Sequence, residues 1–266
     1  MYPYLFHIGG FSLASYGVLV ALGYIFGVYY IRRKMPRGLM DDDSLWNFIL
    51  FIVLGAVFGG KILYAILYWH EFGTDFLSRL WGVIREFRFG FVFYGGFLGA
   101  FAAGYWYIKH KKLSPFVVAD YCAPAIALGH TFGRIGCFMA GCCHGGPSGA
   151  WPGVKFCRVD SLVDRDLLCI PVHPVQLYEA AGNLIIFLVL NKLLSCRRGF
   201  VARDGMIFAL YGASYALLRF MLEYLRGDDR GGLLLGLSPS QLVALAVFTA
   251  CAAFAVSAKL REKKNG

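Results

Sequence analysis

One arginine within a long apolar stretch is the residue best suited to chemistry in this sequence. Residues 123–145 read APAIALGHTFGRIGCFMAGCCHG, and Arg134 lies near the middle of that run. An unpaired arginine in hydrocarbon costs about 2.5 to 17 kcal/mol, so such a residue is expected to face a ligand, a polar cavity or an opposite charge. Its planar guanidinium gives phosphate two parallel donors, and Gly133 and Gly136 leave space beside it. We therefore expect Arg134 to bind an anionic group.

Two further cations, Lys61 and Arg219, also lie within apolar runs. Glu223 follows Arg219 by four residues, which places both side chains on one face of a helix and allows an ion pair. Alternatively, either long cationic side chain extends along its helix to the membrane surface. The structural alternative for Arg134 is likewise a carboxylate partner, either Glu179 or Glu223.

A cluster of three thiols and one imidazole ends the central stretch: Cys137, Cys142, Cys143 and His144. The C-x4-C-C-H spacing lacks the paired C-x-x-C of structural zinc sites, so the sequence predicts no metal and no cofactor. A nucleophilic thiol that takes up an acyl or glyceryl group is the reactive alternative, with Cys142 as the candidate. The simplest expectation is that the thiols pack beside a lipid cavity.

The remaining five cysteines fall into two groups. Cys157 and Cys169 lie in a polar segment expected outside the membrane, where a disulfide between them would close a short loop. Cys122, Cys196 and Cys251 lie in or beside apolar runs, and we expect them to pack as small apolar residues.

The elements that position these residues are membrane-spanning helices. Of 266 residues, 58% are hydrophobic and only 16% charged, whereas soluble domains carry about a quarter charged residues. A span needs about 20 apolar residues. We expect an all-α integral membrane protein with seven transmembrane helices, at residues 11–31, 45–69, 91–108, 115–142, 174–194, 205–225 and 239–258, and a polar, aromatic loop at residues 70–88. Residues 1–266 are expected to form a single polytopic domain, with an extramembrane insert at residues 144–173 that contains a hairpin around WPGVKFCRV.

The placement of charge predicts the orientation of the chain. The segments after the first, third, fifth and seventh spans hold fifteen Lys and Arg residues, and the opposite side holds eight, Arg88 and Arg230 among them. By the positive-inside rule, the N-terminus lies outside and the C-terminus lies in the cytoplasm. The net charge of +10 therefore encodes topology, and we expect the membrane bilayer and no nucleic acid as a partner.

Two motifs carry a family resemblance. The fragment GRIGCFMAGCCHG at residues 133–145 and HPVQLYEA at residues 173–180 resemble the signature segments of the prolipoprotein diacylglyceryl transferases. The family signature is Gly-Arg-x-Gly-Asn-Phe-x-Asn-x-Glu-x-x-Gly, with a later His-Pro-x-Gln-Leu-Tyr-Glu. The fragments FSLASYGVLVALGYIFG, FGGKILYAILY, FYGGFLGA and RFMLEYLRGDD resemble further family segments in the same order, so the resemblance covers nearly the whole chain.

The resemblance implies a fold, a reaction and a location. Its members move a diacylglyceryl group from phosphatidylglycerol to the lipobox cysteine thiol of a prolipoprotein, and they release glycerol-1-phosphate. They do so on a seven-span fold at the outer face of the bacterial inner membrane. The expected partners are phosphatidylglycerol or another anionic phospholipid and prolipoprotein substrates. Such a reaction needs a thiolate in a dry site and a cationic clamp on the departing phosphate.

The resemblance also assigns roles to residues of this sequence. Arg134 and Arg219 correspond to family arginines and would clamp the phosphate as catalytic groups. Tyr94 and Cys142 stand where the family carries a histidine and a glutamate, and they complete the predicted catalytic set. The predicted substrate-binding residues are Tyr16, Lys61, Gly133, Cys137, Gly145, His173, Gln176, Tyr178, Glu179 and Arg226.

The departures from the family pattern change the available chemistry. The signature has Asn and Glu where this chain has Cys137 and Cys142, and Tyr94 replaces a histidine. A phenol with an unperturbed pKa near 10 is a weak base unless a cation lowers that pKa. His130 and His144 are the candidates for a replacement imidazole.

Two alternative functions share the same scaffold. One is a thiol-dependent lipid acyltransferase or redox enzyme that uses Cys142 or Cys143. The other is a non-catalytic phospholipid-binding relative that kept the phosphate clamp. Only the first requires a free thiolate, so alkylation of thiols distinguishes it from the second and from the diacylglyceryl transferase, whose acceptor the sequence leaves open.

Overall fold

The computed structural model describes residues 2–8, 11–85, 90–149, 152–227 and 236–265. Its contacts divide the chain into two compact units, which we describe separately. The first unit comprises Met1–Lys34 and Ala119–Gly266, and the second comprises Met35–Val118. Arg88, Arg230 and the start of the expected WPGVKFCRV hairpin at residues 150–151 lie outside the described residues.

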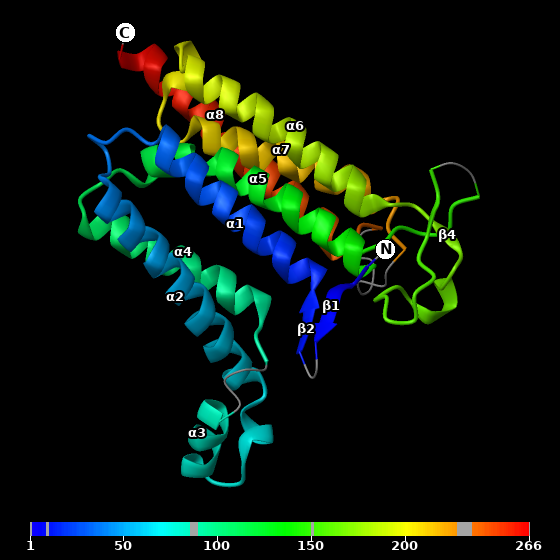
Figure 1. The fold of residues 1–266 in the computed structure, drawn as a ribbon. Helices are drawn as coiled ribbons and strands as arrows, with labels where there is room; N and C mark the ends of the chain where they lie inside the picture. The colour runs from blue at the N-terminus through cyan, green and yellow to red at the C-terminus, as the bar shows by residue number, and fades with distance from the viewer. Residues whose placement is uncertain (1, 9–10, 86–89, 150–151, 228–235, 266) are drawn as a thin grey trace. The chain divides into compact units, whose positions relative to one another are not determined.

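Five long helices form the first unit: α1 (Ser15–Lys34), α5 (Pro115–Ala140), α6 (Val175–Cys196), α7 (Met206–Glu223) and α8 (Pro239–Asn265) (Figure 1). The helix α7 packs against both α6 and α8. Small residues bring α1 close to α5, because a Cβ added to Gly23 would lie 2.8 Å from Phe132 Cβ and 3.2 Å from the Gly129 carbonyl oxygen. Close backbone approach at glycine is the usual way in which membrane helices gain contact.

The second unit is built on a glycine-packed pair, α2 (Asp42–Leu67) and α4 (Phe93–His110). Gly55 and Gly59 on α2 face Gly95 and Gly99 on α4, and a Cβ added to any of the four would lie within 2.4 Å of a carbonyl oxygen of the partner helix. Each helix thus presents a G-x-x-x-G pattern to the other. Between them lie η1 (Trp69–Phe72) and α3 (Phe76–Arg85). The expectation of a loop at residues 70–88 was wrong for α3, whose ten residues wind into a helix.

The helices confirm the predicted membrane character in part. Among the described residues, five helices are long and apolar enough to cross a membrane: α1, α2, α6, α7 and α8. The helices α4 and α5 lie at the other two predicted spans, and their crossing of the membrane stays a prediction. The first expected span starts too early, because Phe11–Ala14 forms strand β2, which pairs in antiparallel fashion with β1 (Tyr4–Ile8). An apolar strand that leads directly into an apolar helix leaves no break in the sequence pattern.

The insert after α5 forms a small disulfide-linked lobe within the first unit. Strand β3 (Val154–Lys155) pairs with β4 (Pro171–Val172), η2 (Arg165–Leu167) lies between them, and the predicted Cys157–Cys169 disulfide is present. Three side chains form its core: Phe156, Val163 and Val172. The lobe and the β1–β2 hairpin lie at the same end of the unit, where the Arg158 guanidinium lies 5.4 Å from the ring centre of Tyr2 (Figure 1).

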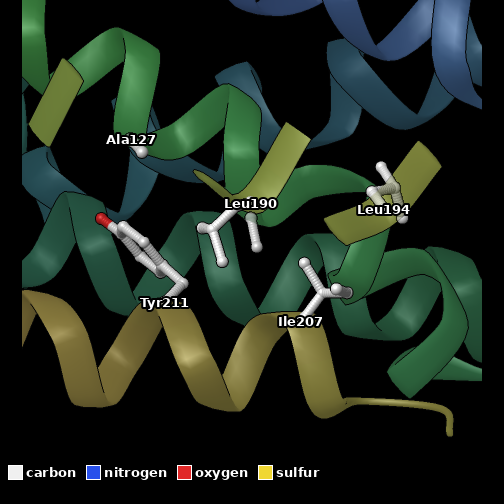
Figure 2. Close-up of a cluster of buried hydrophobic side chains, with 6 residues drawn as sticks. Ala127, Leu190, Leu194, Ile207 and Tyr211 are labelled. Atoms are coloured by element: carbon white, nitrogen blue, oxygen red, sulfur yellow. The ribbon is translucent and has the colours of Figure 1, made fainter. Parts of the chain in front are cut away.

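An apolar core joins one half of α5, α6 and α7. Its buried residues are Ala123, Ala127, Leu190, Leu194, Ile207 and Tyr211 (Figure 2). The buried carboxylate of Asp120 anchors the same end of these helices. It accepts hydrogen bonds from the backbone N–H groups of Gly205 (2.9 Å) and Phe208 (3.0 Å) and pairs with the Arg197 guanidinium at 2.9 Å. Since Asp120 occupies donors at the start of α7, it fixes that helix relative to α5.

Candidate functional site

The other half of the same three helices carries a seam of polar side chains, most of them buried or partly buried, with His130 exposed at its edge. We define the polar seam as His130 and Arg134 on α5, Gln176, Glu179 and Asn183 on α6, and Tyr211, Tyr215, Arg219 and Glu223 on α7. Each set repeats at intervals of three or four residues. That spacing places the members of each set on one face of their helix, so that the three faces meet.

Glu179 is the centre of the seam. Its carboxylate is fully buried, and Oε1 accepts a hydrogen bond from the Tyr215 hydroxyl and pairs with Arg134 Nη2, each at 3.0 Å. Asn183 Nδ2 donates to the Glu179 backbone oxygen at 2.9 Å. A buried carboxylate is tolerated only when charged and polar partners surround it in this way. The ion pair with Glu179, which was one of the structural alternatives for Arg134, is therefore observed.

Arg134 keeps part of its surface accessible despite this pairing. Its side chain is 23% exposed, whereas that of Glu179 is 1% exposed. A guanidinium has five N–H donors in a fixed fork, so an ion pair through Nη2 leaves capacity for a second anionic ligand. A Cβ added to the adjacent Gly133 would meet no atom within 4 Å, whereas one added to Gly136 would lie 3.1 Å from the Tyr16 ring. The expected open space is therefore present at Gly133, and Tyr16 fills it at Gly136.

Arg219 lies further along α7 in a second buried ion pair. Its Nη1 is 2.5 Å from Glu223 Oε2, and its Nη2 donates to Ser240 Oγ at 3.1 Å. The Ser238 hydroxyl donates to Glu223 Oε1 at 2.7 Å and accepts from the Gln241 backbone N–H at 3.2 Å. The predicted pairing with Glu223 is confirmed. Ser238 both caps α8 and holds the Glu223 carboxylate of this pair.

Three thiols lie where α5 ends. The Sγ atoms of Cys137, Cys142 and Cys143 are all within 4.8 Å of one another. Gln176 Nε2 donates to the Cys142 backbone oxygen at 2.8 Å, which links this cluster to the seam. Hydrogen bonds from the Cys137 and Cys142 thiols, and then one from the Arg226 guanidinium, hold the pKa of the Cys143 thiol below its ordinary value.

Gly145 fastens the insert to the ends of α6 and α7. Its N–H donates to the His173 carbonyl at 2.9 Å, and it forms a β-bridge with Arg226. A Cβ on Gly145 would lie 2.6 Å from both His173 Cβ and the Leu225 carbonyl oxygen. Only glycine fits where these three segments of the chain meet, which explains why the signature ends in glycine.

The two candidate imidazoles have different surroundings. His130 lies in the polar seam, where Nδ1 shares a hydrogen bond of 3.1 Å with the Tyr211 hydroxyl. His144 is buried in the insert, with Nδ1 2.9 Å from the Gly145 carbonyl oxygen and Nε2 3.5 Å from Asp164 Oδ2. His144 therefore holds the insert together, and His130 is the imidazole near the candidate site.

Other predicted site residues have less defined roles. Tyr16, at the start of α1, packs against Gly136, where an added Cβ would lie 3.1 Å from its ring. His173 is partly buried and contributes its backbone to the Gly145 junction. Tyr178 is partly buried on α6.

Lys61 and Tyr94 belong to the second unit and are described within it. Lys61 is buried on α2, with Nζ 5.2 Å from the ring centre of Tyr64 and 5.7 Å from that of Phe72. The ammonium thus lies among aromatic faces, where cation–π attraction offsets some of its lost hydration. Tyr94 lies in the first turn of α4, and its side chain is exposed.

Sequence reasoning missed Tyr211, Tyr215 and Asn183 as members of the site. The spacing of Tyr211, Tyr215, Arg219 and Glu223 is four residues at each step, so a single face of α7 carries all of them. Extending the Arg219–Glu223 pair backwards by two turns would have found both tyrosines. Asn183 follows Glu179 by the same interval on α6.

Five helices long and apolar enough to span a membrane, with the ion pairs Arg134–Glu179 and Arg219–Glu223 between helices of the first unit and within α7, indicate a multi-pass membrane protein. The sequence matches the prolipoprotein diacylglyceryl transferase family over residues 3–257, and the chain belongs to that family of membrane transferases.

Named relatives agree with this assignment. A phosphatidylglycerol–prolipoprotein diacylglyceryl transferase of Clostridium tetani is 32% identical over 247 residues, which cover 92% of this chain and 93% of the relative. The corresponding transferase 2 of Clostridium perfringens is 33% identical over 240 residues, which cover 90% and 88%. That of Geobacter sulfurreducens is 31% identical over 251 residues, which cover 92% and 91%.

Proposed function

We propose that this protein transfers a diacylglyceryl group from phosphatidylglycerol to the lipobox cysteine thiol of a prolipoprotein and releases glycerol-1-phosphate. The observation that carries the proposal is the partly accessible Arg134 guanidinium, which Glu179 holds at 3.0 Å within the polar seam. Family membership and the names of the relatives support the choice of substrates.

The charges of the seam suit a phosphate that gains charge as it leaves. Arg134 and Arg219 face Glu179 and Glu223, and Arg226 adds a third cation at the outer end. One net positive charge complements the single charge of a phosphodiester. The leaving phosphomonoester carries about −1.5 to −2, so the same cations stabilise the products and the transition state more than the bound lipid.

The carboxylates contribute orientation. Glu179 holds Arg134 through Nη2, and Glu223 holds Arg219 through Nη1, so both guanidinium planes are fixed before a ligand binds. A preorganised donor fork needs little rearrangement during the reaction. We assign Arg134 and Arg219 to the phosphate, and Cys142, at the position of the family Glu, to the acceptor thiol. Tyr94, at the position of the family His, is the remaining proposed catalytic residue.

We further propose seven spans, an outside N-terminus and a cytoplasmic C-terminus in the bacterial inner membrane, with the insert and thiol cluster on the extracytoplasmic side. The excess of Lys and Arg on one side of the predicted spans supports this orientation. A reporter active only in the periplasm should stay inactive when fused after Lys264 and should be active when inserted at Gly149. An active fusion at Lys264 would overturn the orientation.

Purified protein with phosphatidylglycerol and a lipobox peptide tests the reaction. We expect glycerol-1-phosphate release together with a peptide mass increase of one diacylglyceryl group, and complementation of a strain depleted of its own transferase. Binding of the lipid without turnover would favour the non-catalytic alternative. A covalent lipid adduct on Cys142 or Cys143 would favour the thiol-dependent alternative and contradict direct transfer.

A further inference from the structure

We propose that Cys137, Cys142 and Cys143 bind a zinc ion, and that this ion takes the acceptor thiol as its fourth ligand. The metal site rests on the geometry of the cluster alone, whereas the role of the acceptor thiol rests on the proposed function. The C-x4-C-C-H spacing did not predict a metal here, because the ligands come together only through the turn that follows α5.

The three sulfurs are already gathered at one point. All lie within 4.8 Å of one another, and a tetrahedral zinc ion with bonds of about 2.3 Å places its sulfur ligands about 3.8 Å apart. Positive φ angles at Gly141 (86°) and Cys143 (60°) turn the chain sharply as it leaves α5. This turn lets two adjacent cysteines approach the third, five residues earlier on the helix.

The number of ligands indicates an open coordination position. Among the described residues, the group of closely spaced metal-binding side chains contains these three thiols only. The adjacent His144 is directed to the Gly145 carbonyl oxygen and to Asp164. Structural zinc sites have four protein ligands, whereas catalytic sites have three and an exchangeable fourth position.

The surroundings compensate the charge of such a site. Zinc with three thiolates carries one net negative charge. The Arg226 guanidinium lies beside Cys143, and Arg134 interacts electrostatically with Cys137. The Cys142 carbonyl is fixed by Gln176 at 2.8 Å, which holds the ligand backbone in place.

Zinc would supply the acceptor activation for which this chain lacks the family His and Glu. The acceptor thiol binds the ion as a thiolate and gives its proton to water. Its sulfur then attacks the diacylglyceryl carbon that is bonded to the phosphate oxygen. The C–S bond forms, the C–O bond breaks with its electron pair on glycerol-1-phosphate, and the neutral thioether leaves the unchanged ion.

Cobalt(II) alone, added to the reduced full-length protein after zinc removal, tests the metal site. We expect sulfur-to-cobalt charge-transfer bands and intense tetrahedral d–d bands at a stoichiometry of about one ion per chain. Because loss of an outer-shell partner already weakens metal binding about 10- to 100-fold, Cys142→Ser should weaken cobalt binding at least as much. Cys122→Ser, at a free cysteine outside the cluster, is the matched control and should leave the spectrum unchanged.

The results separate the metal site from the proposed function. A lipobox peptide should shift the d–d bands, and the same peptide with serine in place of its cysteine should not. Absent bands, bands that survive Cys142→Ser, or a disulfide among the three cysteines in freshly isolated protein would overturn the metal site. Bands that the cysteine peptide leaves unmoved would overturn the role of the acceptor. Unchanged transfer by metal-free protein would overturn the role of the ion in acceptor activation and leave the proposed function standing. Cobalt bands without any transfer would overturn the proposed function and leave the metal site standing.

Discussion

The two halves of the α5–α6–α7 core follow different physical rules. One half is apolar, with Leu190, Leu194 and Ile207 packed side by side (Figure 2). The other half is the polar seam, in which Arg134 and Tyr215 converge on Glu179. The stability of the apolar half depends on how well its side chains fill the space, so its residues are exchangeable for other apolar residues of similar size. The seam depends on pairing, so the removal of one member leaves another buried and unsatisfied.

Tyr211 joins the two halves. Its ring belongs to the apolar cluster, and its hydroxyl shares a hydrogen bond of 3.1 Å with His130. A tyrosine suits this boundary because it combines a large apolar surface with one polar atom. The apolar half holds the helices in place, and the seam uses their fixed positions to keep charged groups inside a membrane.

The largest effect is expected at the centre of the seam. Glu179→Ala should destabilise the protein by about 3 to 5 kcal/mol, since it breaks a buried ion pair and leaves the Tyr215 hydroxyl without its acceptor. It should also abolish transfer, because Arg134 loses its orientation. Thermal melting in detergent and glycerol-1-phosphate release measure the two effects. Glu179→Gln, which keeps the shape and an oxygen acceptor, should be the milder variant, and an Ala variant with full stability would contradict the pairing rule.

The next largest effect is expected in the apolar half. Leu190→Ala should cost about 2 to 5 kcal/mol of stability through the cavity that it leaves. Transfer measured well below the melting temperature should remain near the wild-type rate, because no seam residue loses a partner. Leu188→Ala, at an exposed position on the same helix, is the matched control and should change melting little. A large loss of transfer in folded Leu190→Ala would show that the two halves are not separable.

A smaller effect should distinguish the two tyrosines of α7. Tyr215→Phe removes the hydrogen bond to Glu179 and should cost about 1 to 3 kcal/mol, with a fall in transfer. Tyr211→Phe keeps the ring in the apolar cluster and removes only the contact with His130. We expect it to lower transfer less than Tyr215→Phe does. Equal rates in the two variants would place His130 in the catalytic path alongside Glu179.

The sequence predicted the long helices well because a span requires an uninterrupted apolar run, and each expected run contains a helix. It failed where apolarity does not distinguish strand from helix, as at Phe11–Ala14, and where an aromatic-rich segment resembled a loop, as at Phe76–Arg85. The Cys157–Cys169 disulfide was predictable from the sequence because only two cysteines lie in the insert.

The site was predicted less completely than the fold. Arg134 stood out because a charge in an apolar run is costly. The sequence could not show whether Glu179 or Glu223 pairs with Arg134, because both acids lie on later helices and only the three-dimensional structure shows which one is in contact. The proximity of the three thiols depends on left-handed backbone at Gly141 and Cys143, which spacing along the chain does not reveal.

In the proposed function, Arg134 binds the lipid phosphate, and its ion pair with Glu179 only positions the guanidinium. The direct measurement compares melting and phosphatidylglycerol affinity on the same samples of Arg134→Ala, Arg134→Lys and the double variant Arg134→Ala/Glu179→Gln. Arg134→Lys keeps the charge without the two-pronged donor and should weaken lipid binding while it retains melting.

Arg134→Ala should lower the melting temperature, because Glu179 is left buried without its cation, and should weaken lipid binding by about 2 to 5 kcal/mol. The double variant removes both charges. We predict that it recovers the melting temperature and does not recover lipid affinity. Recovery of both in the double variant would show that Arg134 only neutralises Glu179, and it would contradict the account.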